Sequence, residues 1–125
     1  NGLAHRIYAG SDLFLMPSRF EPCGLSQMIA MRYGTVPVVT RTGGLADTVQ
    51  AFDAKAGSGT GFVCAAQTVE AVLAGVREAV ATFHSADRWE RVVGNAIAAD
   101  FSWDASVGEY LRLYRLAAAR HTGDV

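Results

Sequence analysis

Short continuous apolar runs recur along the first half of the chain. They occupy residues 13–16, 36–39 and 61–64. Such runs do not alternate with polar residues, which is typical of parallel strands buried on both faces. Pro37 lies in the second run and fits either the first residues of a strand or an edge position. The pattern predicts three short parallel strands.

Segments with helical spacing lie between and after these runs. Residues 3–8 read as the tail of a helix, and residues 25–33 as a helix that closes at Gly34. A short helix is predicted over 45–51, with Asp47 in its first turn. Residues 53–60 contain Gly57, Ser58 and Gly59 and are predicted to form a flexible surface loop.

Three further helices are predicted in the second half. The first begins after Thr68, a good N-cap, with Glu70 in its first turn. Its predicted inner face comprises Val69, Val72, Leu73, Val76, Val80 and Phe83. The next opens at Ser85 or Asp87 and presents Trp89, Val92, Val93, Ala96 and Ile97. After a break at 100–104, a final helix over about 104–121 presents Val107, Tyr110, Leu111 and Tyr114. We expect the tail 121–125 to be disordered.

Strands that alternate with helices predict an α/β fold with a parallel sheet and right-handed crossovers. Ligands of such sheets bind beyond the carboxyl ends of the strands. Two glycine-containing loops, 17–24 and 40–44, follow strands at that edge. We therefore expect both loops to face one crevice.

The first of these loops joins a strand to a helix N-terminus. That arrangement presents free backbone N–H groups and the positive end of a helix dipole to an anion. Glu21 and Cys23 lie at the mouth of the loop, before Gly24, Leu25 and Ser26. Backbone donors for a phosphate, together with a carboxylate for a polar neutral group, predict a phosphate-bearing sugar ligand.

Composition narrows the possible partners. The 125 residues allow at most one domain, and half of them are hydrophobic. A formal net charge of −1 gives no electrostatic case for nucleic acid or for an acidic membrane surface. Two cysteines form no disulfide framework, and no membrane span or signal peptide is visible, so a cytoplasmic protein is expected. His5, His84 and His121 have no metal-site spacing.

Four motifs carry a resemblance to a known family. They are the segments 17–25 (PSRFEPCGL), 41–49 (RTGGLADTV), 59–62 (GTGF) and 100–103 (DFSW). In this order and approximate spacing the chain resembles, from about residue 9 to 114, the C-terminal nucleotide-sugar domain of bacterial glycogen synthases and plant starch synthases. The resemblance implies a retaining glucosyltransferase of GT-B fold. Residues 1–125 would then be the second half of its Rossmann-like C-terminal domain.

The resemblance implies transfer of glucose from ADP-glucose to the non-reducing end of an α-1,4-glucan, with no cofactor and no catalytic metal. It places Glu21 at the donor glucose as the catalytic residue. It places Gly24, Leu25 and Ser26 on the diphosphate, and Cys23 on the wall of the donor site. The loop of Thr42, Gly43 and Gly44 would lie near the nucleotide and sugar.

Two features limit what the resemblance implies. The wider superfamily often has a second Glu, bound to the ribose, eight positions after the first; here that position is Ile29, which fits the glycogen-synthase branch and leaves ribose recognition unassigned. The family's basic residues for the leaving diphosphate, and its acceptor domain, lie upstream of Asn1. Losing that charge stabilisation raises the barrier by several kcal/mol (~3 or more). We therefore expect a fragment that is inactive alone and that self-associates through unpartnered apolar surfaces.

Plainer interpretations stand beside these. Glu21 could be a solvated loop acid or a helix cap, Arg19 a surface residue or a partner of that acid, and Cys23 a small buried hydrophobe. Gly43 and Gly44 could simply form a turn and the start of a helix. A set of aromatic residues is expected in core or interdomain packing: Trp89, Phe101, Trp103, Tyr110 and Tyr114. At the level of function, the alternatives are a non-catalytic nucleotide-binding module and a glycosyltransferase with another nucleotide-sugar donor.

Overall fold

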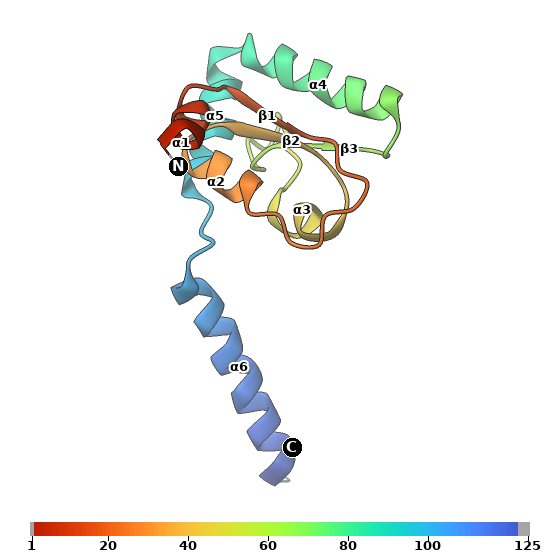
Figure 1. Cartoon of the computed structure of the whole chain (residues 1–125). Coiled ribbons are helices and arrows are strands. Elements are labelled where there is room, and N and C mark those ends of the chain that lie inside the picture. The colour runs from red at the N-terminus through yellow and green to blue at the C-terminus, as the bar shows by residue number, and fades with distance from the viewer. Residues whose placement is uncertain (1, 123–125) are drawn as a thin grey trace.

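The computed structural model describes residues 2–122, which form helices around a small sheet (Figure 1). The helices are α1 (Gly2–Ala9), α2 (Ser26–Arg32), α3 (Gly43–Thr48), α4 (Val69–Phe83), α5 (Ala86–Ala98) and α6 (Trp103–Thr122). The strands are β1 (Leu13–Met16), β2 (Val36–Thr40) and β3 (Phe62–Cys64). Predicted strand positions agree with these bounds to within one residue.

The three strands pair in the order β1-β2-β3, and both pairings are parallel. Val38 at the centre of β2 lies opposite Leu15 on one side and Phe62 on the other. Each connection between neighbouring strands contains a helix, as parallel pairing requires. The predicted parallel α/β architecture is confirmed.

Burial differs between the strands. All five residues of β2 are buried, whereas Leu15 on β1 is 49% exposed. The prediction that every run is buried on both faces is therefore wrong for β1. The reason is that β1 pairs only with β2 among the described residues, so one edge and part of one face lack cover. Pro37 is the second residue of the central strand, where its missing N–H is tolerated near the strand start.

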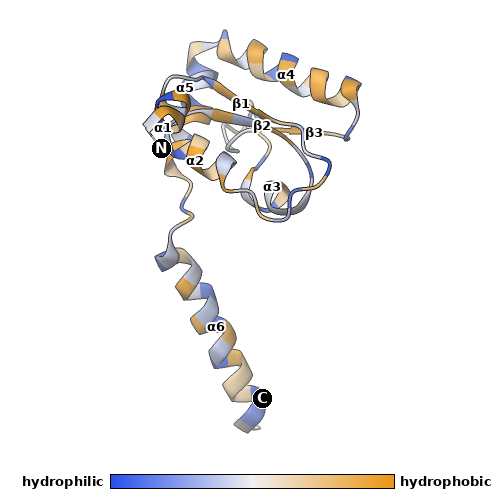
Figure 2. Cartoon of the chain, viewed as in Figure 1, coloured by the Kyte–Doolittle hydropathy of each residue, from blue (hydrophilic) through white to orange (hydrophobic). Residues whose placement is uncertain are grey.

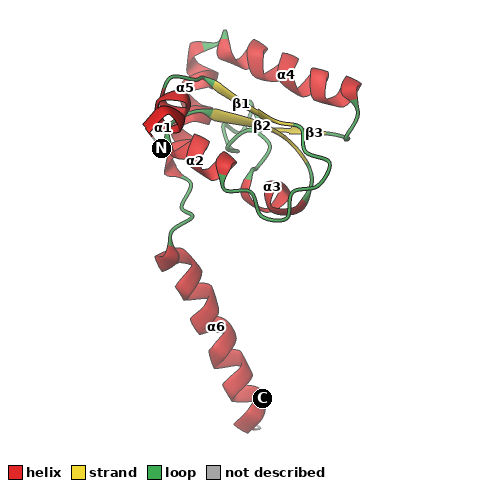
Figure 3. Ribbon diagram, in the orientation of Figure 1, coloured by secondary structure: helices red, strands yellow, loops and turns green. Residues whose placement is uncertain are grey.

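Helices lie on both faces of the sheet (Figure 3), and an apolar cluster packs on each face. One contains Val36, Val38, Phe62, Cys64 and Ala79, with α4 packed over it. The other contains Met31, Val39, Leu45, Val49 and Ala96, with α2 and α3 over it. Helix α5 contributes to both clusters, through Val92 and Ala96 respectively. Burial in the second cluster holds α2, through Met31, and α3, through Leu45, against the sheet.

The inner face of α4 is predicted only in part: Val72 and Val76 pack against the core as expected. Its buried residues are Gly75, Ala79 and Thr82, whereas the predicted Val69 is 79% exposed. A Cβ at position 75 would lie 2.9 Å from the Cys64 sulfur, so the helix approaches the sheet through its small residues. Apolar periodicity alone weights large side chains and therefore rotates the predicted face. Thr68 caps the helix as expected, its hydroxyl accepting the Ala71 N–H at 3.2 Å.

Helix α6 extends away from the sheet and its covering helices (Figure 1). Figure 2 shows hydrophobic residues interspersed along it, and the predicted packing positions Trp103 and Tyr114 are 79% and 68% exposed. These two aromatics therefore do not pack in the core of the described residues, and their expected interdomain packing stays a prediction. Trp89 does pack, with its ring 5.1 Å from that of Phe83. Among residues 2–122, no helix is both long and apolar enough to cross a membrane.

Part of the predicted disordered tail, residues 123–125, lies outside the described residues. Residues 121 and 122 belong to α6 instead, because the helix continues to Thr122.

Candidate functional site

The loop between β1 and α2 ends in an uncapped helix N-terminus. Gly24 has a φ of 68°, a left-handed conformation that favours glycine. Leu25 occupies the N-cap position and contributes no side-chain hydrogen bond to the helix. The backbone N–H groups of Gly24, Leu25 and Ser26 have no hydrogen-bond partner among the described residues. These donors are available to an anion, as the sequence predicts.

The carboxylate and the thiol of this loop are both accessible. Glu21 is partly exposed and Cys23 exposed with a free thiol. No ion pair joins Glu21 to Arg19 within the described region, and Glu21 does not cap α2. The alternative that Cys23 is a buried hydrophobe is wrong, because the thiol lies on the outside of the loop. Burial raises the pKa of the Cys64 thiol, which lies in the core as expected.

Helix α3 begins two residues earlier than predicted. Thr42 is its extended N-cap, with φ −150° and ψ 140°, and Gly43 and Gly44 form its first turn. Asp47 is consequently the fifth residue of the helix and is exposed, so the prediction that it lies in the first turn is wrong. Thr42 makes no side-chain cap hydrogen bond, which leaves its hydroxyl available.

The two glycine loops touch through their backbones. A Cβ at Gly43 would lie 1.8 Å from the Glu21 carbonyl oxygen, and one at Gly44 would lie 1.7 Å from that of Cys23. The N–H of Gly44 donates to the Glu21 carbonyl oxygen at 3.2 Å. The loops therefore meet at the carboxyl edge as predicted. The Gly44 amide is occupied in this contact, so glycine at 44 serves the close approach.

Side chains that sequence reasoning missed add two more links between the loops. The Thr40 hydroxyl donates to the Ser18 carbonyl oxygen at 2.5 Å. The Gln27 amide, fully buried, donates to the Thr48 hydroxyl at 3.0 Å. A signal for Gln27 is present in the sequence: on a helix it shares a face with Ala30 and Met31, so it is a polar residue on a buried apolar face.

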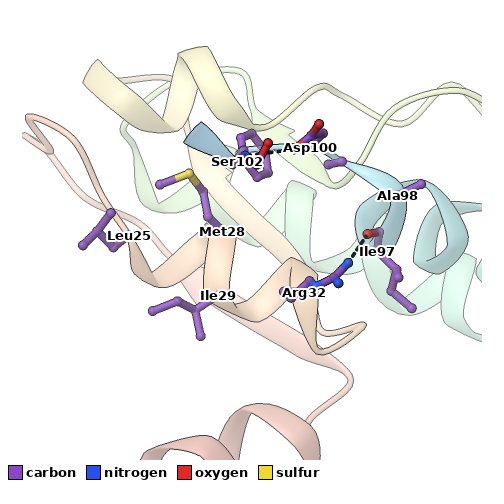
Figure 4. A pocket seen from close by; sticks show the side chains of 10 residues that line it. Leu25, Met28, Ile29, Arg32, Ile97, Ala98, Asp100 and Ser102 are labelled. Carbon is purple, nitrogen blue, oxygen red and sulfur yellow. Dashed lines mark hydrogen bonds between the residues drawn. The ribbon is translucent and has the colours of Figure 1, made fainter. Parts of the chain in front are cut away.

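A hollow of about 700 Å³ lies beside this loop, between α2 and the segment that follows α5 (Figure 4). Its walls are largely apolar and include Leu25, Met28, Ile29 and Phe101. Arg32 Nη1 donates to the Ile97 carbonyl oxygen at 3.4 Å across the hollow. Through Leu25 the hollow adjoins the free amides of the helix N-terminus.

Asp100 lines the hollow, and its carboxyl group has a lowered pKa. The Ser102 N–H donates to Asp100 at 2.9 Å, and this bond, with a smaller contribution from Arg32, holds the pKa of the carboxyl below 3.8.

Among residues 2–122, no three His, Cys, Asp or Glu side chains gather closely enough to hold a metal ion.

A parallel sheet whose two glycine loops meet at the carboxyl edge, beside free helix-terminal amides, defines a Rossmann-like α/β domain. The family model described as "Glycosyl transferases group 1" matches residues 3–92. The chain belongs to this glycosyltransferase family, and the predicted family resemblance is confirmed.

The sequence is similar to those of several glycogen synthases. The chain is 56% identical over 117 residues to a glycogen synthase of Anaeromyxobacter dehalogenans, covering 94% of the chain and 24% of that protein. It is 53% identical over 114 residues to a glycogen synthase of Desulforudis audaxviator, covering 90% of the chain and 23% of that protein. The chain thus spans about a quarter of the length of these relatives.

Solved structures show the same architecture. The catalytic domain of starch synthase IV from Arabidopsis thaliana, bound to ADP and acarbose, matches with a TM-score of 0.81 and 38% identity. That match covers 95% of this chain and 25% of the chain in that structure. A sucrose-phosphate synthase from Thermosynechococcus elongatus matches with a TM-score of 0.60 and 28% identity, covering 91% of the chain and 27% of that structure.

Proposed function

We propose that this chain is part of the nucleotide-sugar domain of a glycogen or starch synthase. The parent protein would transfer glucose from ADP-glucose to the non-reducing end of an α-1,4-glucan, with retention of configuration. One observation carries the proposal: two glycine loops meet through their backbones at the carboxyl edge, and the first of them carries Glu21 and three free backbone amides. Identities of 53% and 56% to named glycogen synthases support it. A cytoplasmic location remains part of the proposal.

The proposed roles divide the loop into two parts. The free N–H groups of Gly24, Leu25 and Ser26 bind the diphosphate, since an uncapped helix N-terminus favours negative charge. Glu21 faces the donor glucose as the catalytic residue, and the exposed Cys23 lines the same site. A site of this kind needs both parts held at a fixed separation.

The second glycine loop contributes to the proposed site because it lies against the first loop. Thr42 carries a hydroxyl that is not used as a helix cap and can reach a polar group of the ligand. Gly43 and Gly44 allow the loop to lie against the Glu21 and Cys23 carbonyls. Their role is to bring α3 near the nucleotide and sugar without a side chain in the way.

The hollow beside Leu25 is our proposed location for the nucleoside. It adjoins the diphosphate amides, and Ile29 lines it. Ile29 stands at the position where the wider superfamily often has a ribose-binding Glu. An apolar wall there means that the ribose hydroxyls find their partners elsewhere, on residues outside this chain or through water.

Turnover requires more than this chain. The chain spans about a quarter of the length of its named relatives, and we propose that the basic residues for the leaving diphosphate and the acceptor domain belong to other parts of the parent protein. Stabilising charge on a leaving group is commonly the largest single contribution to catalysis. We therefore propose that the α-1,4-glucan is bound mostly by other parts of the parent protein and that this chain alone does not transfer glucose.

A donor panel tests the proposal directly. The full-length protein is assayed for glycogen elongation with ADP-glucose, UDP-glucose and GDP-mannose. Elongation with ADP-glucose as the preferred donor is expected. Elongation only with another donor would favour a second candidate, a related glycosyltransferase with a different nucleotide-sugar donor. The structural similarity to a sucrose-phosphate synthase supports this second candidate. No transfer from any donor would favour a non-catalytic module.

Exposed apolar surface also leads us to propose that the isolated chain self-associates. Leu15 on the edge strand is 49% exposed, and Trp103 on α6 is 79% exposed. Unpaired edges and contiguous apolar surface promote association. Light scattering at high concentration should report species larger than one chain. A monodisperse monomer would contradict the proposal.

A further inference from the structure

A part-buried series of hydrogen bonds links the two glycine loops. Gln27 Nε2 donates to the Gly24 carbonyl oxygen at 2.6 Å and to Thr48 Oγ1 at 3.0 Å. The Thr48 hydroxyl in turn donates to the Gly44 carbonyl oxygen at 2.6 Å. These hydrogen bonds connect the backbone of one glycine loop to the backbone of the other through two side chains, the fully buried Gln27 and the half-buried Thr48.

The surroundings fix the orientation of the Gln27 carboxamide. The side chain is fully buried, and Nε2 also lies 3.5 Å from the Cys23 carbonyl oxygen. All the groups facing Nε2 act as acceptors, because the Thr48 hydroxyl donates its proton to the Gly44 carbonyl oxygen. Rotating the amide by half a turn would place its oxygen 2.6 Å from the Gly24 carbonyl oxygen, a repulsive contact.

This orientation leaves the Gln27 carbonyl without a partner. Oε1 is a buried acceptor that no donor reaches among the described residues. It lies 2.6 Å from where a Cβ of Gly24 would stand, so only glycine at 24 leaves room for it. Unsatisfied buried acceptors are rare in folded proteins and call for an explanation beyond packing. An apolar side chain of similar volume would fill the space without that penalty.

Peptide geometry supplies the explanation. A peptide bond is planar and trans, so its N–H points opposite to its C=O. The bond from Gln27 to the Gly24 carbonyl therefore aims the Leu25 N–H away from the buried amide. The weaker contact to the Cys23 carbonyl acts in the same way on the Gly24 N–H. The two N–H groups that Gln27 orients are among the three that lack partners.

We propose that Gln27 and Thr48 are positioning residues, which aim the diphosphate-binding amides and hold the two loops together. The inference rests on the proposed function of residues 24–26. Gln27 acts through the peptide units on either side of Gly24. Thr48 acts through Gln27, by holding the carboxamide and by tying it to Gly44.

Steady-state kinetics of the full-length protein test the proposal. Gln27→Met keeps the volume and removes the donor. It should raise the KM for ADP-glucose about tenfold or more, with kcat changed by less than about threefold, because hydrogen bonds to a charged group are strong. Thr48→Val should raise KM by several-fold, about five, whereas Thr48→Ser keeps the hydroxyl and should match the wild type. A KM for Gln27→Met within about twofold of wild type would overturn the proposal.

A double variant separates positioning from general stabilisation. Because Thr48 acts through Gln27, adding Thr48→Val to Gln27→Met should raise KM no further than Gln27→Met alone. Multiplied effects on KM would contradict this. Equal effects of Thr48→Val and Thr48→Ser would also contradict it, and this pair remains informative should Gln27→Met fail to fold.

Hydrogen–deuterium exchange distinguishes failure of this inference from failure of the proposed function. Gln27→Met changes no residue of α3, yet it should speed amide exchange over Gly43–Thr48 in the nucleotide-free full-length protein, because the loops loosen. Unchanged exchange would overturn the positioning role. Absence of glucosyl transfer in the wild type would count against the proposed function alone, and the exchange result would still decide the positioning role.

Discussion

The N–H of Gly44 donates to the carbonyl oxygen of Glu21 across 3.2 Å, joining the first turn of α3 to the loop after β1. The two residues are far apart in sequence, yet a Cβ on Gly44 would lie 1.7 Å from the carbonyl oxygen of Cys23. The proposed catalytic carboxylate and the second glycine loop are thus parts of one packed unit. Changes at position 44 should act on the site as a whole.

Substituting this glycine should be severe. Gly44→Ala places a methyl group against a backbone oxygen that cannot move without the loop, and we expect a loss of about 3 kcal/mol in the free energy of unfolding. Gly94→Ala on α5 is the matched control, since nothing lies within 4 Å of its added Cβ. The control should be neutral or more stable by up to about 1 kcal/mol. Urea denaturation measures both, and equal effects would contradict the close approach of the loops.

Two threonines at helix starts should behave differently. The Thr68 hydroxyl accepts the Ala71 N–H, so Thr68→Ala should lower the free energy of unfolding by about 1 kcal/mol. Thr42 makes no such bond, so Thr42→Ala should change stability by less than about 0.5 kcal/mol. In the full-length protein Thr42→Ala should instead raise the KM for ADP-glucose. Comparable losses of stability would show that Thr42 is a cap.

The two cysteines should react at different rates with iodoacetamide. Cys23 is exposed, whereas Cys64 is buried and its pKa is raised by burial, which lowers its thiolate fraction. Mass spectrometry should find Cys23 modified first, and Cys23→Ser should abolish the fast phase. If the proposed site is correct, ADP slows the reaction of Cys23. Modification of both thiols at one rate would contradict the structure.

Acid should weaken the turn at Asp53. The N–H groups of Ala56 and Lys55 donate to its carboxylate and hold its pKa below 3.8. A pKa lowered by folding stabilises the native state above 3.8, and this contribution is lost as pH falls through the folded-state pKa. Asp53→Asn should therefore melt below wild type at about pH 6, with the difference shrinking toward about pH 3. Lys55→Gln, which keeps the acceptor, should leave the pH dependence unchanged; a pH-independent difference for Asp53→Asn would contradict the assignment.

The sequence was informative wherever chemistry is local. The apolar run Leu13–Met16 lies between polar residues and Pro17, and the strand occupies those four positions. Thr68 has the side chain and the following helix that an N-cap requires, and the hydrogen bond is present. The strand-loop-helix order placed both glycine loops at one edge, because parallel connectivity leaves no other arrangement.

The sequence was misleading wherever packing depends on distant partners. The inner face of α4 follows Gly75 and Ala79, since closeness to Cys64 selects small residues over the larger Val69. The bond from Gln27 to Thr48 joins residues 21 positions apart and is invisible to any local pattern. The exposure of Trp103 likewise depends on which partners surround α6.

The central claim is that residues 24–26 bind the diphosphate while Glu21 serves the sugar. Calorimetric titration of ADP into the full-length protein and its Glu21→Ala variant, with glucosyl transfer measured on the same samples, tests it most directly. Because ADP lacks the glucose, its affinity should change by less than about threefold, whereas kcat should fall by at least about 1,000-fold. Loss of ADP binding in the variant, or retention of transfer, would contradict the division of the loop.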